Sequence, residues 1–189
     1  MHDLEPHYNW RHLYVASEDD RSPMYGHFNS EVYYTDSIYD FVIHPQWDNI
    51  GSETLFIKVL FAEYDEGYAI IELLGEWNDV LTNDIMTLKH EVLDLMMDQG
   101  IDKFILIAEN VLNFHADSTD YYDEWLEEIP DGWIVFLNAR EHILKELADY
   151  GIDQYFLFGG QMNDISWRTK SPRKLFDQIK KLAERRLEV

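Results

Sequence analysis

The stretch that decides the fold is KFILIAENVLNFHADSTDYYDE, residues 103–124. It opens with the apolar run FILIA at residues 104–108, which is typical of a strand buried on both faces. A short polar loop with one apolar anchor, Phe114, is predicted to follow. Asp117-Ser118-Thr119 then precede residues 120–129, where the spacing predicts a helix. A strand followed directly by a helix indicates a βαβ unit and a parallel sheet.

The chain on either side of this stretch predicts the other elements of one α/β domain. Apolar runs predict five strands, at residues 54–62, 68–74, 103–108, 133–137 and 154–158. A turn at residues 64–67 makes the first two strands a hairpin, after which residues 75–79 are expected to leave the sheet. With helices between and after the later strands, the predicted order is β-β-α-β-α-β-α-β-α. The fold class is therefore α/β, with a mixed, mainly parallel sheet.

Polar residues mark where each predicted helix begins. Thr82 or Asn83 is expected to cap the helix that ends at Gly100. Asn138 with Glu141 resembles a capping box for the helix that ends at Gly151. Ser171-Pro172 predicts an N-cap followed by a proline in the first turn of the last helix.

Residues 1–50 are predicted to form an N-terminal extension to a domain at residues 51–189. They hold ten of the 28 aromatic side chains, so we expect this segment to pack on the body or on a second copy in a homodimer. Short strands are predicted at residues 11–16 and 32–34, with a loop at residues 17–26 between them.

The composition limits the classes of partner. The chain has 189 residues and a formal net charge of −22, which argues against nucleic acid and against anionic membranes. Its apolar runs are too short to span a membrane. It contains no cysteine, which fits a reducing cytoplasm. Residues 168–189 nevertheless hold eight of the 15 Lys and Arg, so this basic end is expected to fold back on the acidic body or to dock a partner.

Three motifs in the sequence are informative together: Gly75-Glu76-Trp77-Asn78, Phe114-His115-Ala116-Asp117-Ser118-Thr119, and residues 140–152. They resemble motifs of the STAS domain, the fold of anti-sigma factor antagonists of the SpoIIAA type. Gly75-Glu76-Trp77-Asn78 is similar to the family's Gly-Glu-Leu-Asp. Phe114-His115-Ala116-Asp117-Ser118-Thr119 is similar to its Phe-x-Asp-Ser-Ser, with one extra residue and with Asp120 where the family usually has Gly. Residues 140–151 and Ile152 match its third helix, which ends in Gly-Leu or Gly-Ile. The resemblance covers roughly residues 54–187.

This resemblance implies a function without catalysis. In the family, the serine after the aspartate is phosphorylated by a partner anti-sigma kinase, and that position corresponds to Ser118, with Thr119 beside it. The unmodified domain binds its partner and the phosphorylated domain releases it. By similarity, this chain is expected to be a regulatory module that binds a protein partner such as an anti-sigma factor. The alternative for Ser118 and Thr119 is that they only cap a helix.

A ligand site at the carboxyl ends of the strands is the second interpretation. Ligands of open α/β sheets bind at this edge. The residues expected to gather there, as candidates for binding a ligand or a partner, are Trp77, Asn78, Asp79, Asn110, Asp117, Ser118, Asn138, Arg140 and Gly159-Gly160. The competing interpretation is ordinary loop and cap chemistry, because none of their spacings is diagnostic of a ligand.

Catalysis and metal binding have weaker signals. A hydrolase using Ser118 with His115 is an alternative, but no Gly-x-Ser-x-Gly motif surrounds the serine. The sequence contains no His-Glu-x-x-His motif and no carboxylate–histidine cluster, so no metal site is predicted. No Gly-Lys-Ser/Thr follows Gly159-Gly160, so these glycines do not form a phosphate loop, and no cofactor is predicted.

Overall fold

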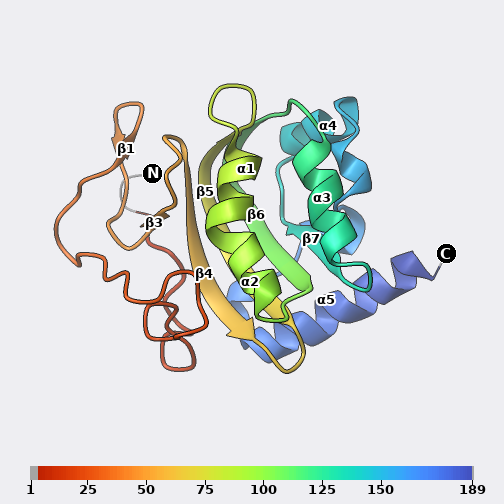
Figure 1. The fold of residues 1–189 in the computed structure, drawn as a ribbon, viewed down its shortest axis with the longest axis horizontal. Helices are drawn as coiled ribbons and strands as arrows, with labels where there is room; N and C mark the ends of the chain where they lie inside the picture. Colours follow the sequence, from red (N-terminus) through yellow and green to blue (C-terminus); the bar gives the residue numbers. More distant parts are fainter. Residues whose placement is uncertain (1–3, 189) are drawn as a thin grey trace.

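A five-stranded mixed sheet forms the centre of the molecule (Figure 1). The computed structural model describes residues 4–188, so residues 1–3 of the predicted extension and residue 189 of the predicted domain lie outside the described residues. The strands, in their order across the sheet, are β3 (Asp48–Asn49), β4 (Leu55–Glu63), β5 (Tyr68–Asn78), β6 (Lys103–His115) and β7 (Trp133–Leu137). β4 is antiparallel to β3 and to β5, whereas β5, β6 and β7 are parallel. The predicted mixed α/β fold and its first hairpin are confirmed.

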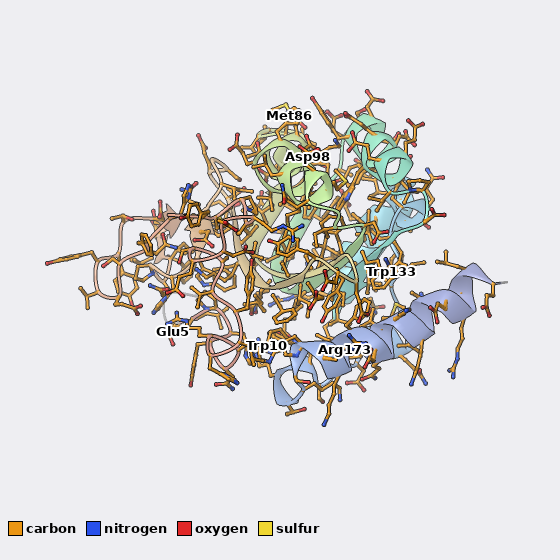
Figure 2. The ribbon with its side chains drawn as sticks, turned by 60° about the horizontal axis from the view of Figure 1, so that its bottom comes forward. Glu5, Trp10, Met86, Asp98, Trp133 and Arg173 are labelled. Atoms are coloured by element: carbon orange, nitrogen blue, oxygen red, sulfur yellow. The ribbon has the colours of Figure 1, made fainter. Side chains whose placement is uncertain are left out.

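Helices cover both faces of this sheet. One helical run consists of α1 (Asp84–Leu88), the π-helical turn η1 (Lys89–Leu93) and α2 (Asp94–Asp98). It lies on the same face as α3 (Asp120–Glu128) and α4 (Glu141–Asp149). α5 (Pro172–Leu187) lies on the opposite face, as Figure 2 shows. Three 3₁₀ turns connect α4 to α5: η2 (Ile152–Gln154), η3 (Gly160–Asn163) and η4 (Trp167–Thr169).

The two faces of β5 explain why it is continuously apolar. Ala69, Ile71 and Leu73 belong to the core under α1 to α4, whereas Tyr68 and Ile70 belong to the core under α5. All eleven residues of β5 are buried. A central strand covered on both sides has no solvent-facing row, so the alternation seen in half-exposed strands is absent.

β5 and β6 are longer than the sequence indicates. Residues 75–78 were expected to leave the sheet and residues 109–115 to form a loop; both predictions are wrong, because these segments pair with each other as parallel strands. The register has two irregularities, which interrupt the regular alternation of side chains between the two faces of the sheet. A search for that alternation in the sequence therefore does not predict this pairing. The second irregularity is at Gly75, where φ is +111° and an added Cβ would lie 2.1 Å from the carbonyl oxygen of Thr54, so only glycine fits.

The predicted fifth strand is wrong as a strand. Residues 154–158 contribute a single bridge, in which the Leu157 N–H donates to the Ile134 carbonyl (2.8 Å) and the Phe136 N–H donates to the Leu157 carbonyl (2.9 Å). The segment begins inside the 3₁₀ turn η2 and ends at Gly159, whose φ is +77°. Within this segment, the parallel bridge to β7 is therefore made by Leu157 alone.

Two of the three predicted helix caps are also wrong. Neither Thr82 nor Asn83 caps α1, because Asn83 is left-handed and the Thr82 hydroxyl donates to the Asn78 carbonyl. Asn138 does not cap α4, because its side-chain amide bonds both backbone groups of Ile165 instead. The third cap is confirmed: Ser171 Oγ accepts the Lys174 N–H, with Pro172 in the first turn of α5.

The N-terminal segment runs along the β4 edge of the sheet, on the left in Figure 1. The predicted strands at residues 11–16 and 32–34 are wrong; the segment forms β1 (Ser37–Ile38) and β2 (Phe41–Val42) as a small hairpin and adds β3 to the sheet. Trp10 and Trp47 are buried against the body, whereas seven other aromatic side chains are exposed: Tyr8, Tyr25, Phe28, Tyr33, Tyr34, Tyr39 and Phe41.

Candidate functional site

The carboxyl ends of β5 and β6 bring the two sequence motifs together. β5 ends at Asn78 and β6 at His115, and these residues are register partners. The Asp79 N–H donates to the His115 carbonyl (2.8 Å), which ties the loop before α1 to the turn before α3. Both connections lie at the top of Figure 1. The motif around Trp77 and the motif around Ser118 are therefore neighbours at one edge of the sheet.

Asp79 joins the elements at this edge. One carboxylate oxygen accepts Trp77 Nε1–H and the Ile85 N–H, both at 2.9 Å, and so serves as the side-chain cap of α1. The other accepts the Tyr122 hydroxyl of α3 at 2.5 Å. Asp79 is only 4% exposed. Burial raises the pKa of Asp79 to about 6, although the three hydrogen bonds favour the carboxylate and oppose this shift.

Glu76 forms a second group at the same edge. Its carboxylate accepts the Tyr39 hydroxyl (2.6 Å) and the Asn78 side-chain amide (3.1 Å), and it lies 3.4 Å from His115 Nε2. Burial alone would raise the pKa of Glu76, but the bonds from Tyr39 and Asn78 and the charge of His115 outweigh burial and lower it. The N-terminal segment therefore takes part in this edge through Tyr39.

Asp84 is a third buried acid here. It lies in the first turn of α1, and one oxygen accepts the backbone N–H of Asn78 at 2.8 Å. Burial raises the pKa of Asp84. Sequence reasoning missed Asp84 and Tyr122; an acid at a helix start was the available signal for Asp84, and no local pattern identifies Tyr122.

Ser118 and Asp117 are exposed in the turn before α3, and Thr119 is partly exposed. Neither hydroxyl caps the helix in the usual way: Ser118 Oγ accepts the Asp120 N–H (3.2 Å), and the Thr119 hydroxyl lies 3.3 Å from an Asp123 oxygen. Among residues 4–188, no hydrogen bond joins Ser118 to His115, whose ring nitrogen lies near Glu76 instead.

The other predicted residues do not converge with this group. Asn110 lies within β6 opposite Leu74, and its buried Nδ2 has no hydrogen-bond partner in the described part of the chain, residues 4–188. Asn138 holds Ile165, as described above. Arg140 is exposed and donates to the Glu109 carbonyl (3.2 Å). The structure thus brings Trp77, Asn78 and Asp79 together, whereas Asn110 of β6 and the residues that follow β7, Asn138 and Arg140, make separate contacts.

A buried acid on the α5 face was not predicted as a site residue. One oxygen of Glu72 accepts the His7 backbone N–H (2.8 Å), and the other lies 3.6 Å from Arg168 Nη2. Arg168 also pairs with Glu109. Burial raises the pKa of Glu72 to about 7, while the His7 bond and Arg168 oppose the shift. The signal in the sequence was a single acid inside the apolar run YAIIELL at residues 68–74.

Two further findings concern metals and membranes. Within residues 4–188, no group of three or more histidine and acidic side chains is arranged to hold a metal ion. No helix in that same part of the chain is both long enough and apolar enough to cross a membrane.

Two solved structures are similar to this chain. The anti-sigma factor antagonist SpoIIAA in its unphosphorylated form aligns over 66% of this chain and 96% of its own, with 8% identity and a TM-score of 0.45. The Bacillus cell fate determinant SpoIIAA in the phosphorylated form aligns over 65% and 98%, with 9% identity and a TM-score of 0.40. SpoIIAA is also the type of protein that the sequence motifs resemble. No known family profile matches the sequence, and no curated protein matches it.

Proposed function

We propose that this chain is a non-catalytic, STAS-like regulatory protein of the cytoplasm that binds a protein partner through the carboxyl edge of its sheet. Phosphorylation at Ser118, or at the neighbouring Thr119, controls that binding. The proposal rests on the motif resemblance and on the surface that surrounds the exposed Asp117-Ser118-Thr119 turn.

One observation carries the proposal: two adjacent aliphatic side chains are exposed at this edge, next to polar side chains that are buried. Asp79, Glu76 and Asn78 are buried; the Asn78 side-chain amide donates to Glu76, and Asp79 accepts Trp77 Nε1–H. Val80 and Leu81, in the loop tied to the Ser118 turn, are exposed, and Leu81 is 81% exposed. Adjacent exposed aliphatic residues on a rigid edge are typical of a surface that another protein covers.

The charges around this surface indicate the partner's chemistry. Asp117, Asp120 and Asp123 lie in or beside the turn, and all three are exposed. A partner that covers Leu81 and also presents basic groups would match both features. A phosphate on Ser118 adds about −1.5 to −2 charges. A partner packed on Leu81 would have to bury part of that charge beside existing carboxylates, so phosphorylation is expected to weaken binding.

A small-ligand site or a hydrolase at this edge has less support. Such a site needs polar groups that converge on an open space. Trp77 is fully buried, Asp79 is bonded to Trp77, Ile85 and Tyr122, and Ser118 bonds its own turn. The hydrogen bonds of Asp79 already join α1 and α3 to the sheet, so its carboxylate is not directed at an open space.

A pull-down from native lysate tests the proposal. The baits are wild-type protein, the double variant Ser118→Asp/Thr119→Asp, and Gln178→Glu, which adds one acid on the exposed side of α5, on the other face of the sheet. We expect one protein partner to be held by wild type and by Gln178→Glu and to be lost from the double variant. The same partner on all three baits would keep a binding role and reject the switch. No protein partner on any bait would contradict the proposed function.

A further inference from the structure

A hollow of about 610 Å³ lies between the β1–β2 hairpin and residues 49–54, the segment that leads into β4. This volume is within the ~300–1,000 Å³ that is usual for ligand pockets. Phe56 of β4, which is 2% exposed, and Ser52, which is 4% exposed, form part of its lining. Tyr39, in the turn of the hairpin, also lines it.

The hairpin beside this hollow is fixed on the sheet by core packing. Ile38 and Ile43 are each 1% exposed and pack in one cluster with side chains of β4 and β5. An added Cβ at Gly75 would lie 2.6 Å from Ile38, so the hairpin is in close contact with β5. The residues that the hairpin contributes to the hollow are therefore held in place before anything binds.

The charges in the hollow all have one sign. Among the described residues that line it, the charged ones are Asp36 and Glu53. Asp36 accepts the Asn49 side-chain amide (3.2 Å) and the Thr35 hydroxyl (3.3 Å), which are neutral donors. Glu53 is exposed. A cationic group in the hollow would therefore be next to two carboxylates.

Three hydrogen bonds connect the hollow to the exposed Leu81 loop. Tyr39 donates its hydroxyl to Glu76 (2.6 Å), and the Asn78 amide donates to the other Glu76 oxygen (3.1 Å). The Asn78 side-chain carbonyl accepts the Leu81 N–H (2.9 Å). His115, the basic side chain in this group, lies 3.4 Å from Glu76, whose charge offsets it. The hairpin and the loop before α1 both lie at the top of Figure 1, so a protein that covers Leu81 is close to the hollow.

The lining favours arginine among the basic side chains. Tyr39 is 71% exposed, and a planar guanidinium can stack on its ring while it pairs with a carboxylate, which the ammonium of a lysine cannot do. The chain contains this arrangement elsewhere. Arg168 stacks on Trp167, with its Cζ 4.4 Å from the ring centroid, and also pairs with Glu109.

We propose that the hollow binds an arginine side chain of the partner protein, between Tyr39 and the carboxylates of Asp36 and Glu53. This inference rests on the proposed function, because the protein that covers Leu81 is the source of the arginine. It adds a requirement to that function: the partner has an arginine next to the apolar residues that cover Leu81. Binding of arginine to the hollow can be measured without the partner, so the two proposals can fail separately.

NMR titration of the full chain tests the hollow with N-acetyl-L-arginine N-methylamide, which reproduces an arginine within a chain. We expect saturable shifts of the Tyr39 and Glu53 signals, with a Kd of about 1–10 mM. The citrulline analogue, which has a similar shape without the charge, is expected to bind at least about tenfold more weakly, and the lysine analogue at least about threefold more weakly. No saturable binding below ~50 mM, or equal affinity of either analogue, would overturn the proposal.

Matched variants place the binding in the hollow. The double variant Asp36→Asn/Glu53→Gln keeps the side-chain shapes and removes both charges, and it is expected to weaken binding of the arginine probe at least about tenfold. Glu127→Gln is the control, because Glu127 is exposed on α3 and does not line the hollow. Its affinity should stay within about twofold of wild type. The amide spectrum confirms that each variant is folded. A folded double variant with wild-type affinity would overturn the proposal.

Two further outcomes identify the source of the arginine. Free L-arginine that binds more than about tenfold more tightly than the blocked probe would show that a free amino acid is the ligand, and would overturn the proposal. In the pull-down, a partner that Asp36→Asn/Glu53→Gln holds as well as wild type does would also overturn it and would leave the proposed function intact. Loss of the partner from this double variant, with retention by Glu127→Gln, is the expected result.

Discussion

At the residue scale, the carboxylate of Asp79 accepts three hydrogen bonds from buried donors. Asp79→Ala leaves Trp77 Nε1–H, the Ile85 N–H and the Tyr122 hydroxyl without their partner. Each unsatisfied buried donor costs roughly 1–3 kcal/mol, so we expect the free energy of unfolding to fall by at least about 3 kcal/mol. Urea unfolding measures this change.

Two controls make the test of Asp79 specific. Asp79→Asn keeps an acceptor for two of the donors and should cost less than the alanine variant. Asp117→Ala removes an exposed acid from the same edge and is expected to change stability by no more than about 0.5 kcal/mol. If Asp79→Ala and Asp117→Ala have the same stability, Asp79 does not hold α1 and α3 on the sheet.

Glu72 makes stability depend on pH. Its pKa rises from 4.5 to about 7 on folding because of burial, so the folded state favours the protonated acid. This contribution to stability is complete below pH 4.5 and is lost as the pH rises through 7. One pKa unit corresponds to 1.36 kcal/mol. The free energy of unfolding of Glu72→Gln, relative to that of wild type, should therefore rise by about 3 kcal/mol between pH 4.5 and pH 8. Urea unfolding of both proteins across that range measures the difference; a constant difference contradicts the account.

At the element scale, α3 and α5 have similar start signals and different caps. Ser171 accepts the Lys174 N–H, whereas Thr119 makes no cap bond to the backbone of α3. Ser171→Ala is therefore expected to lower the free energy of unfolding by about 1 kcal/mol. Thr119→Ala should change it by less than about 0.5 kcal/mol. Equal losses in urea unfolding would mean that both residues act as caps.

How far the elements could be predicted from the sequence depends on how local their signals are. The β4–β5 hairpin, the core of β6, and the Ser171 cap follow from patterns within a few residues, and the structure confirms them. The ends of β5 and β6 depend on pairing across the register shift at Gly75, and no local pattern contains that pairing. The segment that includes Leu157 is apolar enough for a strand, but its neighbours belong to turns.

The candidate site was predictable to a similar extent. Trp77, Asn78 and Asp79 were expected at the edge, and they do lie together there. Their bonds were not predictable, because the partners Tyr39 and Tyr122 come from segments far away in the chain. The roles proposed for Ser118 and Thr119 stay predictions.

At the scale of the whole molecule, the N-terminal segment is attached to the sheet through a few buried side chains. Trp47 is 2% exposed and packs with Phe56 and Leu74, whereas Phe28, in the same segment, is 78% exposed. Trp47→Ala should lower the free energy of unfolding by about 3 kcal/mol or more, and Phe28→Ala by no more than about 0.5 kcal/mol. Urea unfolding compares the two. Equal effects would show that the segment is not docked as described.

The exposed aromatic residues of the N-terminal segment are the residues expected to form the contact between two copies of the chain. The homodimer stays a prediction. The division of the chain at residue 50 also stays a prediction; β3, which precedes that residue, pairs with β4 of the main body. Light scattering of the full chain over a range of concentrations would show whether two copies associate.

Site-specific photo-crosslinking tests the central claim most directly. A crosslinking amino acid is placed at Leu81, on the proposed partner surface, or at Gln178, which is exposed on α5. We predict a covalent adduct with one partner protein at Leu81, none at Gln178, and loss of the Leu81 adduct when Ser118→Asp is added. The same adducts at both positions, or an adduct at Gln178 alone, would contradict the claim that the carboxyl edge of the sheet is the partner-binding surface.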